Sequence, residues 1–339
     1  MLSYKNLKIL STGLLLIILT AASVAYAQKK PQLKFNNDGK FKIVQFTDVH
    51  YMLDNRERCD SVLENMSSIL ASEKPDLVIL TGDVFTSGNY KTGWTEVTSP
   101  MRKAHIPWAV AFGNHDHEIG VPNKQIMEFL ETLDYTVAEN GPADLSGSGN
   151  YILKIAGSKD KNTKALIYCI DSHDYPYEKD NPELGDYDWI KFDQVKWYRE
   201  QSKKYTAKNG NKPYPALAFF HIPVPEYNSI KTFPTTVGNR DEEVCSPKIN
   251  SGMYNAFLEC GDVMGTFCGH DHNNNYIGTL NNIALAYGCK TGRDSYGDYD
   301  KGARVIVLSE GERKFDTWLH DTGNAKRYFV QYPESFKKK

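Results

Sequence analysis

Short polar segments that follow apolar runs contain the residues whose types and spacing could do chemistry. One of them, AFGNHDHE at residues 111–118, combines an amide, two imidazoles and two carboxylates directly after an apolar run. Four other apolar runs, well separated along the chain, also end in aspartate or histidine. Together these segments contribute two carboxylates, one amide and four imidazoles, namely Asp48, His50, Asp83, Asn114, His221, His270 and His272.

These residue types and spacings predict a metal centre. In Asp48-x-His50 and His270-x-His272 the two side chains face the same way on an extended chain, so both can reach one site. Mixed oxygen and nitrogen ligands suit Zn²⁺, Mn²⁺ or Fe²⁺/Fe³⁺ better than Ca²⁺ or Mg²⁺ alone. Seven ligands exceed one tetrahedral site, and they suit two ions about 3.5–4 Å apart that share a carboxylate. We therefore expect two divalent or trivalent transition-metal ions.

The elements that must position these residues alternate between strands and helices. Apolar runs typical of buried strands occur at residues 41–47, 76–82, 107–113, 165–171, 215–221, 261–270 and 303–309. Apolar residues at helical spacing predict helices at residues 58–74, 122–133, 192–205 and 251–260. This alternation predicts an α/β fold in which helices cover a buried sheet. Ligands of such folds collect beyond the carboxyl ends of the strands, where the candidate residues stand.

The ordered motifs resemble the signature of the calcineurin-like metallophosphoesterase superfamily. They are Asp48-x-His50, Gly82-Asp83, Gly113-Asn114-His115-Asp116, His221 and Gly269-His270-x-His272. The resemblance extends from about residue 41 to residue 310. Residues 171–198, 219–227 and 296–308 look closest to a secreted phosphatase group classed with the purple acid phosphatases. The resemblance implies a four-layer fold, two packed mixed β-sheets flanked by helices, with the metals at the sheet ends.

The resemblance also implies a division of the ligands between two ions. The first ion would be held by Asp48, His50, Asp83 and His272, and the second by Asp83, Asn114, His221 and His270, with Asp83 bridging. One position departs from the purple enzymes, which have a tyrosine three residues after the bridging aspartate. Here that residue is Thr86, so we expect a colourless protein whose metals the sequence does not identify.

His115 is the predicted general acid, because the matching residue of the family points at the substrate rather than at the metals. We expect a metal-activated hydroxide to attack phosphorus in line, and His115 to protonate the leaving alkoxide. Asp116 could accept from the other ring nitrogen of His115 and fix its tautomer. Alternatively, Asp116 could be a turn residue that bonds to the backbone.

The predicted activity is hydrolysis of a small phosphomonoester by a metal-dependent phosphatase. A phosphodiesterase or nucleotidase on the same site and a non-catalytic metal-binding scaffold are the alternatives. A net charge of −2 gives no reason to expect nucleic acid as a partner. The acidic segment 171–188 would repel polyanions if it overhangs the metals, or it could be a solvated loop elsewhere. Arg56, Lys290 and Arg293 are candidate phosphate-binding cations.

The N-terminus has the layout of a secretory signal peptide at residues 1–27. Lys5 and Lys8 precede an apolar stretch from Ile9 to about residue 22, and Ala-Tyr-Ala follows at residues 25–27. An uncleaved membrane anchor is the alternative, although the apolar stretch is short. We expect residues 28–339 to form one catalytic domain that is exported to the periplasm or the exterior, with no membrane contact after cleavage.

Six cysteines would then lie in an oxidising compartment, and sequence does not choose their pairing. Cys245 with Cys260 is the first disulfide to test. Cys169 and Cys268 lie in apolar runs and could be buried thiols instead. The oligomeric state is likewise left open.

Overall fold

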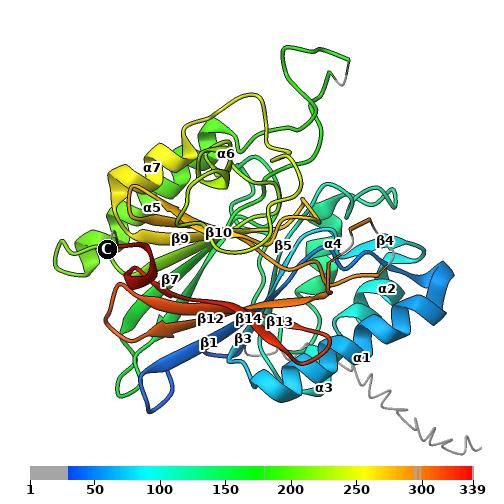
Figure 1. The fold of residues 1–339 in the computed structure, drawn as a ribbon, viewed down its shortest axis with the longest axis horizontal. Coiled ribbons are helices and arrows are strands. Elements are labelled where there is room, and N and C mark those ends of the chain that lie inside the picture. The colour runs from blue at the N-terminus through cyan, green and yellow to red at the C-terminus, as the bar shows by residue number, and fades with distance from the viewer. Residues whose placement is uncertain (1–29, 179, 294–295, 298, 338–339) are drawn as a thin grey trace, which may run out of the picture.

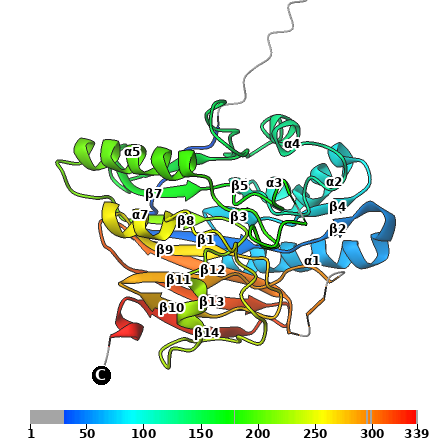
Figure 2. The ribbon, with the colours of Figure 1, turned by 90° about the horizontal axis from the view of Figure 1, so that it is seen from above.

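Two six-stranded mixed sheets form the centre of the protein in a computed structural model that describes residues 30–178, 180–293, 296–297 and 299–337. The first sheet has the order β14-β13-β12-β1-β3-β5, and the second has the order β10-β11-β9-β8-β7-β6 (Figure 2). In the first sheet β1, β3 and β5 are parallel, and in the second β7, β8, β9 and β11 are parallel. The predicted signal peptide, residues 1–27, lies outside the described residues.

The strands of the first sheet are β1 (Lys40–Phe46), β3 (Leu77–Thr81), β5 (Trp108–Ala111), β12 (Gly302–Ser309), β13 (Phe315–Asp321) and β14 (Lys326–Tyr332). Those of the second are β6 (Tyr151–Ala156), β7 (Thr163–Cys169), β8 (Ala216–Phe219), β9 (Val263–Cys268), β10 (Ile277–Leu280) and β11 (Ile283–Tyr287). Two short strands, β2 (Tyr51–Met52) and β4 (Phe85–Ser87), form a separate pair beside the first sheet.

Helices cover the outer faces of the two sheets (Figure 1). Beside the first sheet lie α1 (Arg56–Glu73), α2 (Tyr90–Val97), α3 (Ser99–Lys103) and α4 (Asn123–Leu130). Beside the second lie α5 (Phe192–Lys208), α6 (Tyr227–Lys231) and α7 (Met253–Cys260). The predicted α/β class with two packed mixed sheets flanked by helices is therefore confirmed. Among the described residues no helix is both long enough and apolar enough to cross a membrane.

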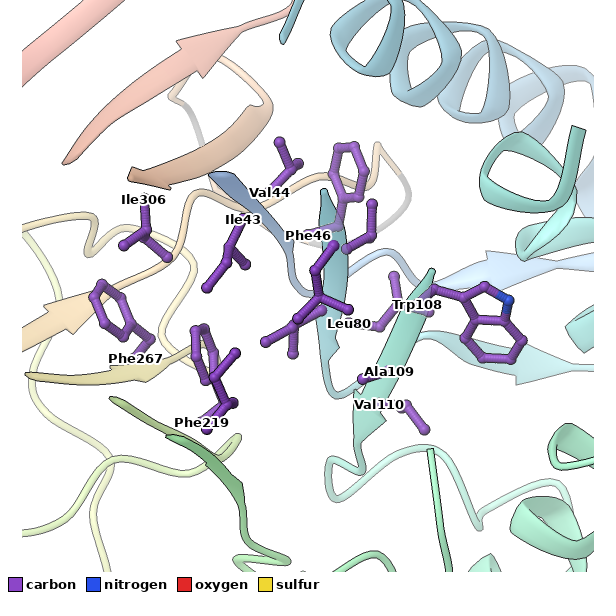
Figure 3. Close-up of a cluster of buried hydrophobic side chains, with 14 of the residues drawn as sticks. Ile43, Val44, Phe46, Leu80, Trp108, Ala109, Val110, Phe219, Phe267 and Ile306 are labelled. Carbon is purple, nitrogen blue, oxygen red and sulfur yellow. The ribbon is translucent and has the colours of Figure 1, made fainter. Parts of the chain in front are cut away.

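The inner faces of the two sheets pack against each other through apolar side chains. Ile43 and Leu80 of the first sheet belong to the same buried cluster as Phe219 and Phe267 of the second (Figure 3). A second cluster, which includes Tyr198 and Phe257, fills the space between the second sheet and its helices. Burial on both faces explains why the parallel strands read as continuous apolar runs.

All predicted helices and strands are present, with ends that shift by a few residues. Elements with weaker patterns were not predicted, among them β14, whose side chains are mostly exposed. The sequence left the cysteine pairing open, and the structure has all six cysteines free, including Cys245 and Cys260, the first pair to test. Cys169 and Cys268 are buried in β7 and β9, as expected for thiols in apolar runs.

Candidate functional site

The candidate ligands lie where neighbouring parallel strands end. Strands β1, β3 and β5 run side by side, and Asp48, Asp83 and Asn114 follow their last residues. In the other sheet β8 and β9 are also parallel neighbours, and they lead into His221 and His270. Because the carboxyl ends of parallel strands meet at one edge of a sheet, each sheet brings its polar residues together.

The side chains form two groups whose ligand atoms all lie within 4.8 Å of one another: Asp48, His50 and His272 in one, and Asp83, His221 and His270 in the other. In the first group His272 Nε2 is 3.4 Å from Asp48 Oδ1. In the second His221 Nε2 is 3.1 Å from Asp83 Oδ2. The same Asp83 oxygen lies 3.8 Å from His50 Nε2, so Asp83 stands between the two groups.

Backbone carbonyls orient two of these imidazoles. His221 Nδ1 donates to the carbonyl oxygen of Thr81 at 2.8 Å, and His272 Nδ1 donates to that of Tyr296 at 3.1 Å. A carbonyl oxygen can only accept, so Nδ1 carries the hydrogen in both rings. The Nε2 nitrogens therefore face the site, that of His272 towards Asp48 and that of His221 towards Asp83. Hydrogen bonds of this kind are typical of histidines that bind metals.

Buried polar atoms without partners support the fit of metal ions to this site. Within the described part of the chain, His50 Nε2, Asn114 Oδ1 and His270 Nε2 are buried and make no hydrogen bond. The Asn114 amide is oriented by its Nδ2, which donates to the hydroxyl oxygen of Tyr175 at 3.1 Å. An orphaned buried acceptor costs about 1–3 kcal/mol, which coordination to a cation would remove. The donor set and its spacing thus fit two transition-metal ions.

The charges in the site act differently on its histidines. Burial favours neutral His50 and His270, whereas at His221 the charge of Asp83 outweighs burial and raises the pKa to about 10. Burial lowers the pKa of His50 to about 4 and that of His270 to about 3, so both rings are neutral at pH 7. Burial raises the pKa of Asp48, but the facing His272 outweighs it and the pKa falls to about 2. For Asp83, His221 outweighs burial in the same way and the pKa lies well below its usual range. Neutral imidazoles and ionised carboxylates are the forms that bind metals.

The backbone around these ligands is held in a sparsely populated conformation. Asp48, His50, Asp83 and His270 have φ angles of 50°, 45°, 50° and 82°, in the left-handed region that non-glycine residues rarely adopt. Such strain concentrates at functional sites, where the surrounding structure maintains it. At Gly113 a Cβ atom would lie 2.3 Å from Asp83 Oδ1, so glycine is required for this close approach. The backbone at Gly113 therefore lies directly against the Asp83 carboxylate.

His115 lies beside the candidate ligands, with its ring half-exposed. Its backbone N–H donates to Asp83 Oδ1 at 2.8 Å, and its Nε2 is 4.0 Å from Asp83 Oδ2. Its Nδ1 lies 2.6 Å from Glu118 Oε2. Burial lowers the pKa of His115, but the charge of Asp83 and the bond to Glu118 outweigh it, and the pKa is raised. A protonated Nε2 beside the metal groups is what a general acid needs.

Asp116 does not contact the His115 ring, and the prediction that it orients this ring is wrong. Its buried carboxylate accepts four backbone N–H bonds, from Asp83, Val84, Phe85 and Gly113, at 2.7–3.2 Å. The alternative interpretation, a turn residue that bonds to the backbone, describes this geometry. Asp116 thereby joins the loop after β3 to the loop after β5.

Three tyrosines that sequence reasoning did not single out as site residues surround the candidate metal centre. Tyr175 contacts Asn114, as described above. Tyr187 meets the His270 ring edge-on at 4.4 Å between centroids, and Tyr296 stacks on His272 at 4.1 Å. No motif marks these residues, although the tyrosines at 175 and 187 belong to the acidic segment noted in the sequence.

The acidic segment 171–188 reaches the site with its two ends. Tyr175 and Tyr187 contact the candidate ligands, and Asp174 lies 3.4 Å from His117 Nε2. The middle of the segment projects away from the sheets (Figure 1), and Tyr177 there is 80% exposed. Among its described residues, the segment thus reaches the site through the residues at its two ends.

The predicted cations make other contacts. Arg56 pairs with Glu96 at 2.8 Å, and Arg293 donates to Ser61 at 3.2 Å. Lys290 is buried, and its ammonium donates to the carbonyl oxygen of Tyr296, behind His272. None of these three contacts, all between described residues, joins a predicted cation to a candidate ligand.

Comparisons with known proteins identify a family and relatives to which this chain is similar. Residues 41–274 match the model of a family described as calcineurin-like phosphoesterase. A relative from Arabidopsis thaliana, named probable inactive purple acid phosphatase 29, is 33% identical over 87% of this chain and 83% of its own length. Phosphatase DCR2 of Saccharomyces cerevisiae is 32% identical over 88% of this chain and 56% of its own length.

The fold also has a solved counterpart. The crystal structure of a dimetal phosphatase from Danio rerio superposes on this chain with a TM-score of 0.57. The superposition covers 86% of this chain and 98% of the Danio rerio chain. At 12% sequence identity this likeness concerns the fold alone.

Proposed function

We propose that this chain, which belongs to the calcineurin-like phosphoesterase family, hydrolyses phosphomonoesters with the help of two transition-metal ions. The observation that carries the proposal is the convergence of six candidate ligand side chains from four separate segments, with the unpartnered amide oxygen of Asn114 as the seventh candidate. Three of them present buried nitrogen or oxygen atoms without a hydrogen-bond partner in the described residues. Unpaired buried atoms lower the stability of a protein without metals, and bound cations would remove this cost.

The two groups of side chains divide the ligands between two ions. Asp48, His50 and His272 would hold one ion, and His221, His270 and Asn114 would hold the other, with Asp83 shared. Bound there, the ions supply Lewis-acid activation of water and positive charge that stabilises a phosphoryl group in transfer. Manganese, zinc or iron suits these ligands, and the donor set alone does not choose among them.

His115 supports the reaction by delivering a proton. The leaving alkoxide of a phosphomonoester needs a proton as its bond to phosphorus breaks. His115 Nε2 lies 4.0 Å from Asp83 Oδ2, so a proton on Nε2 is held at the edge of the metal site. Transfer of that proton to the leaving oxygen leaves a neutral ring, and such general-acid catalysis contributes about 10²–10⁴-fold.

The surroundings of the site favour a small substrate with little charge beyond its phosphate. Glu118 and Asp174 stand beside His115 and His117, and Glu242 accepts a hydrogen bond from the hydroxyl of Tyr296. These carboxylates would repel polyanions such as nucleic acid or highly phosphorylated inositols. A phosphomonoester is therefore the first candidate, and a phosphodiester or nucleotide is the second.

A non-catalytic metal-binding scaffold is the competing function. The relative from Arabidopsis thaliana is named probable inactive, which makes this alternative a real one. In this chain, however, each of the seven candidate ligands is present and His115 lies beside them. A scaffold would need none of the proton-donating geometry of His115, so we favour the enzyme.

Export is part of the same proposal. The apolar stretch after Lys5 and Lys8 and the Ala-Tyr-Ala at residues 25–27 support a signal peptide that is removed in the mature protein. The mature protein would then be one catalytic domain, residues 28–339, in the periplasm or outside the cell.

An ester panel with defined metals tests the proposal. The purified protein is stripped with a chelator, reloaded with Mn²⁺, Zn²⁺, Fe²⁺ or Mg²⁺, and assayed on p-nitrophenyl phosphate and bis(p-nitrophenyl) phosphate. We expect hydrolysis of the monoester to return with at least one transition metal. Preference for the diester would favour a phosphodiesterase. Metal binding without turnover of any ester would favour the scaffold.

A further inference from the structure

The His115 ring has a carboxylate partner that the motif does not contain. Residues 114–120 form tight turns after β5, and the backbone N–H of Glu118 donates to the carbonyl oxygen of His115 at 3.2 Å. Side chains three residues apart in such a turn lie on the same side. The Glu118 carboxylate therefore reaches His115 Nδ1 at 2.6 Å, a short charge-assisted hydrogen bond.

The other carboxylates near His115 are engaged elsewhere. Asp116 accepts backbone N–H bonds from both loops, and Asp174 pairs with His117. Asp83 faces Nε2, on the opposite side of the ring from Nδ1. Glu118 is thus the carboxylate that contacts Nδ1 among the described residues.

A tyrosine from a distant segment holds this carboxylate. The hydroxyl of Tyr175 donates to Glu118 Oε1 at 3.1 Å, while the other oxygen, Oε2, accepts from His115. The same tyrosine oxygen accepts from Asn114 Nδ2. Tyr175 therefore connects a candidate metal ligand with the partner of the predicted acid. Such a connection restricts the orientation of the carboxylate although 43% of the Glu118 side chain is exposed.

We propose that Glu118 is the positioning residue of His115, with a carboxylate that turns the ring so that Nε2 faces the metal centre. This inference rests on the proposed function of His115 as the proton donor. Because a carboxylate only accepts, the hydrogen on Nδ1 stays directed at Glu118. The second hydrogen, on Nε2, is then the one that moves to the leaving oxygen as the bond from phosphorus to oxygen breaks.

Turnover of two monoesters by Glu118 variants tests the proposal. An alkyl phosphate needs the acid, whereas p-nitrophenyl phosphate has a good leaving group and needs it less. Glu118→Ala should lower kcat on the alkyl ester roughly tenfold, a part of the 10²–10⁴-fold of general-acid catalysis, with little change in KM. Glu118→Gln keeps an oxygen that accepts from Nδ1 and should retain most activity. Glu128→Ala, an exposed glutamate of α4, is the matched control.

A second variant separates positioning from a general effect on the fold. In a His115→Ala background, Glu118→Ala should cause no further loss, because Glu118 acts through His115. An additive loss in the double variant would overturn the proposal. Equal loss on both esters, or wild-type turnover by Glu118→Ala, would overturn it as well.

Nuclear magnetic resonance of the metal-free protein gives a readout that does not depend on turnover. With ¹⁵N-labelled histidine at a pH where the ring is neutral, ring shifts show which nitrogen of His115 carries the hydrogen. We expect Nδ1–H in the wild type and a mixture of both tautomers in Glu118→Ala. The same tautomer ratio in both proteins would overturn the proposal. A wild type without any turnover would contradict the proposed function, and this spectrum would still decide on Glu118.

Discussion

Asp83 Oδ2 lies 3.1 Å from His221 Nε2, although the two residues follow strands of different sheets. The same oxygen is 3.8 Å from His50 Nε2, which belongs to the other group of candidate ligands. Asp83 is therefore the point at which the two halves of the site meet, and both halves should depend on it.

Replacing Asp83 by Asn should remove the response of the protein to metals. A metal ion that binds only the folded state stabilises that state by about 2.7 kcal/mol when its free concentration is 100 times its Kd. Asp83→Asn loses the negative charge shared by the two groups, so this stabilisation should largely disappear. Thermal unfolding with and without Mn²⁺ or Zn²⁺ measures it, with Asp144→Asn, an exposed aspartate, as the control. Equal metal stabilisation in wild type and Asp83→Asn would show that Asp83 is not a shared ligand.

Replacing His115 by Ala should spare the metals and impair proton transfer. We expect the variant to bind the same amount of metal but to lose about 10²–10⁴-fold in kcat on an alkyl phosphate. The loss on p-nitrophenyl phosphate should be much smaller, because that leaving group departs without a proton. Steady-state kinetics on both esters, with His105→Ala as the exposed control, measures the difference. An equal loss on both esters would contradict the assignment of His115 as the acid.

Asp116→Ala should act through stability rather than through the proton step. Its carboxylate accepts N–H bonds at 2.7 Å from Val84, 2.8 Å from Gly113, 3.0 Å from Asp83 and 3.2 Å from Phe85. The variant leaves these buried donors unpaired, at a cost of roughly 3 kcal/mol in the free energy of unfolding. Urea unfolding measures that cost. If the stability is unchanged while only the alkyl ester is affected, Asp116 acts on His115 after all.

Glu73 should make the protein sensitive to acid between pH 4.5 and about 2. Burial raises the pKa of Glu73, but hydrogen bonds from His320, Lys326 and Lys42 outweigh it, and the pKa falls from 4.5 to about 2. A carboxylate with a depressed pKa stabilises the folded state above pH 4.5, and this contribution is lost as the pH falls towards 2. Glu73→Gln should be less stable at pH 7 and show a flatter stability profile in this window. Urea unfolding across the window measures both, and parallel profiles would contradict the role of Glu73.

The candidate ligands could be predicted because each of them directly follows an apolar run in the sequence. Apolar runs such as residues 41–47 and 76–82 mark buried parallel strands, and the polar residues after them share an edge of a sheet. This is why the seven candidate ligands could be named before the structure. Strand β14 could not be predicted in the same way, because its exposed edge position leaves little apolar pattern.

Contacts between side chains that are far apart in the sequence could not be predicted from the sequence pattern. His320 lies 2.6 Å from Glu73, on another element, and no local feature of either residue indicates the other. Tyr175 reaches Glu118 and Asn114 from a separate segment for the same reason. The error at Asp116 has a simpler cause, since a carboxylate next to a histidine in sequence points away from it in a tight turn. The pairing of the cysteines was also left open by the sequence, and the structure has Cys245 and Cys260, the first pair to test, both free.

Titration of the metal-free protein with Mn²⁺ or Zn²⁺, while hydrolysis of p-nitrophenyl phosphate is followed in the same sample, tests the central claim most directly. We predict that turnover rises with added metal and reaches its plateau at two ions per chain. A protein that binds no metal at this site, or that stays inactive with two ions bound, would contradict a phosphatase built on Asp83 and its six neighbouring ligands.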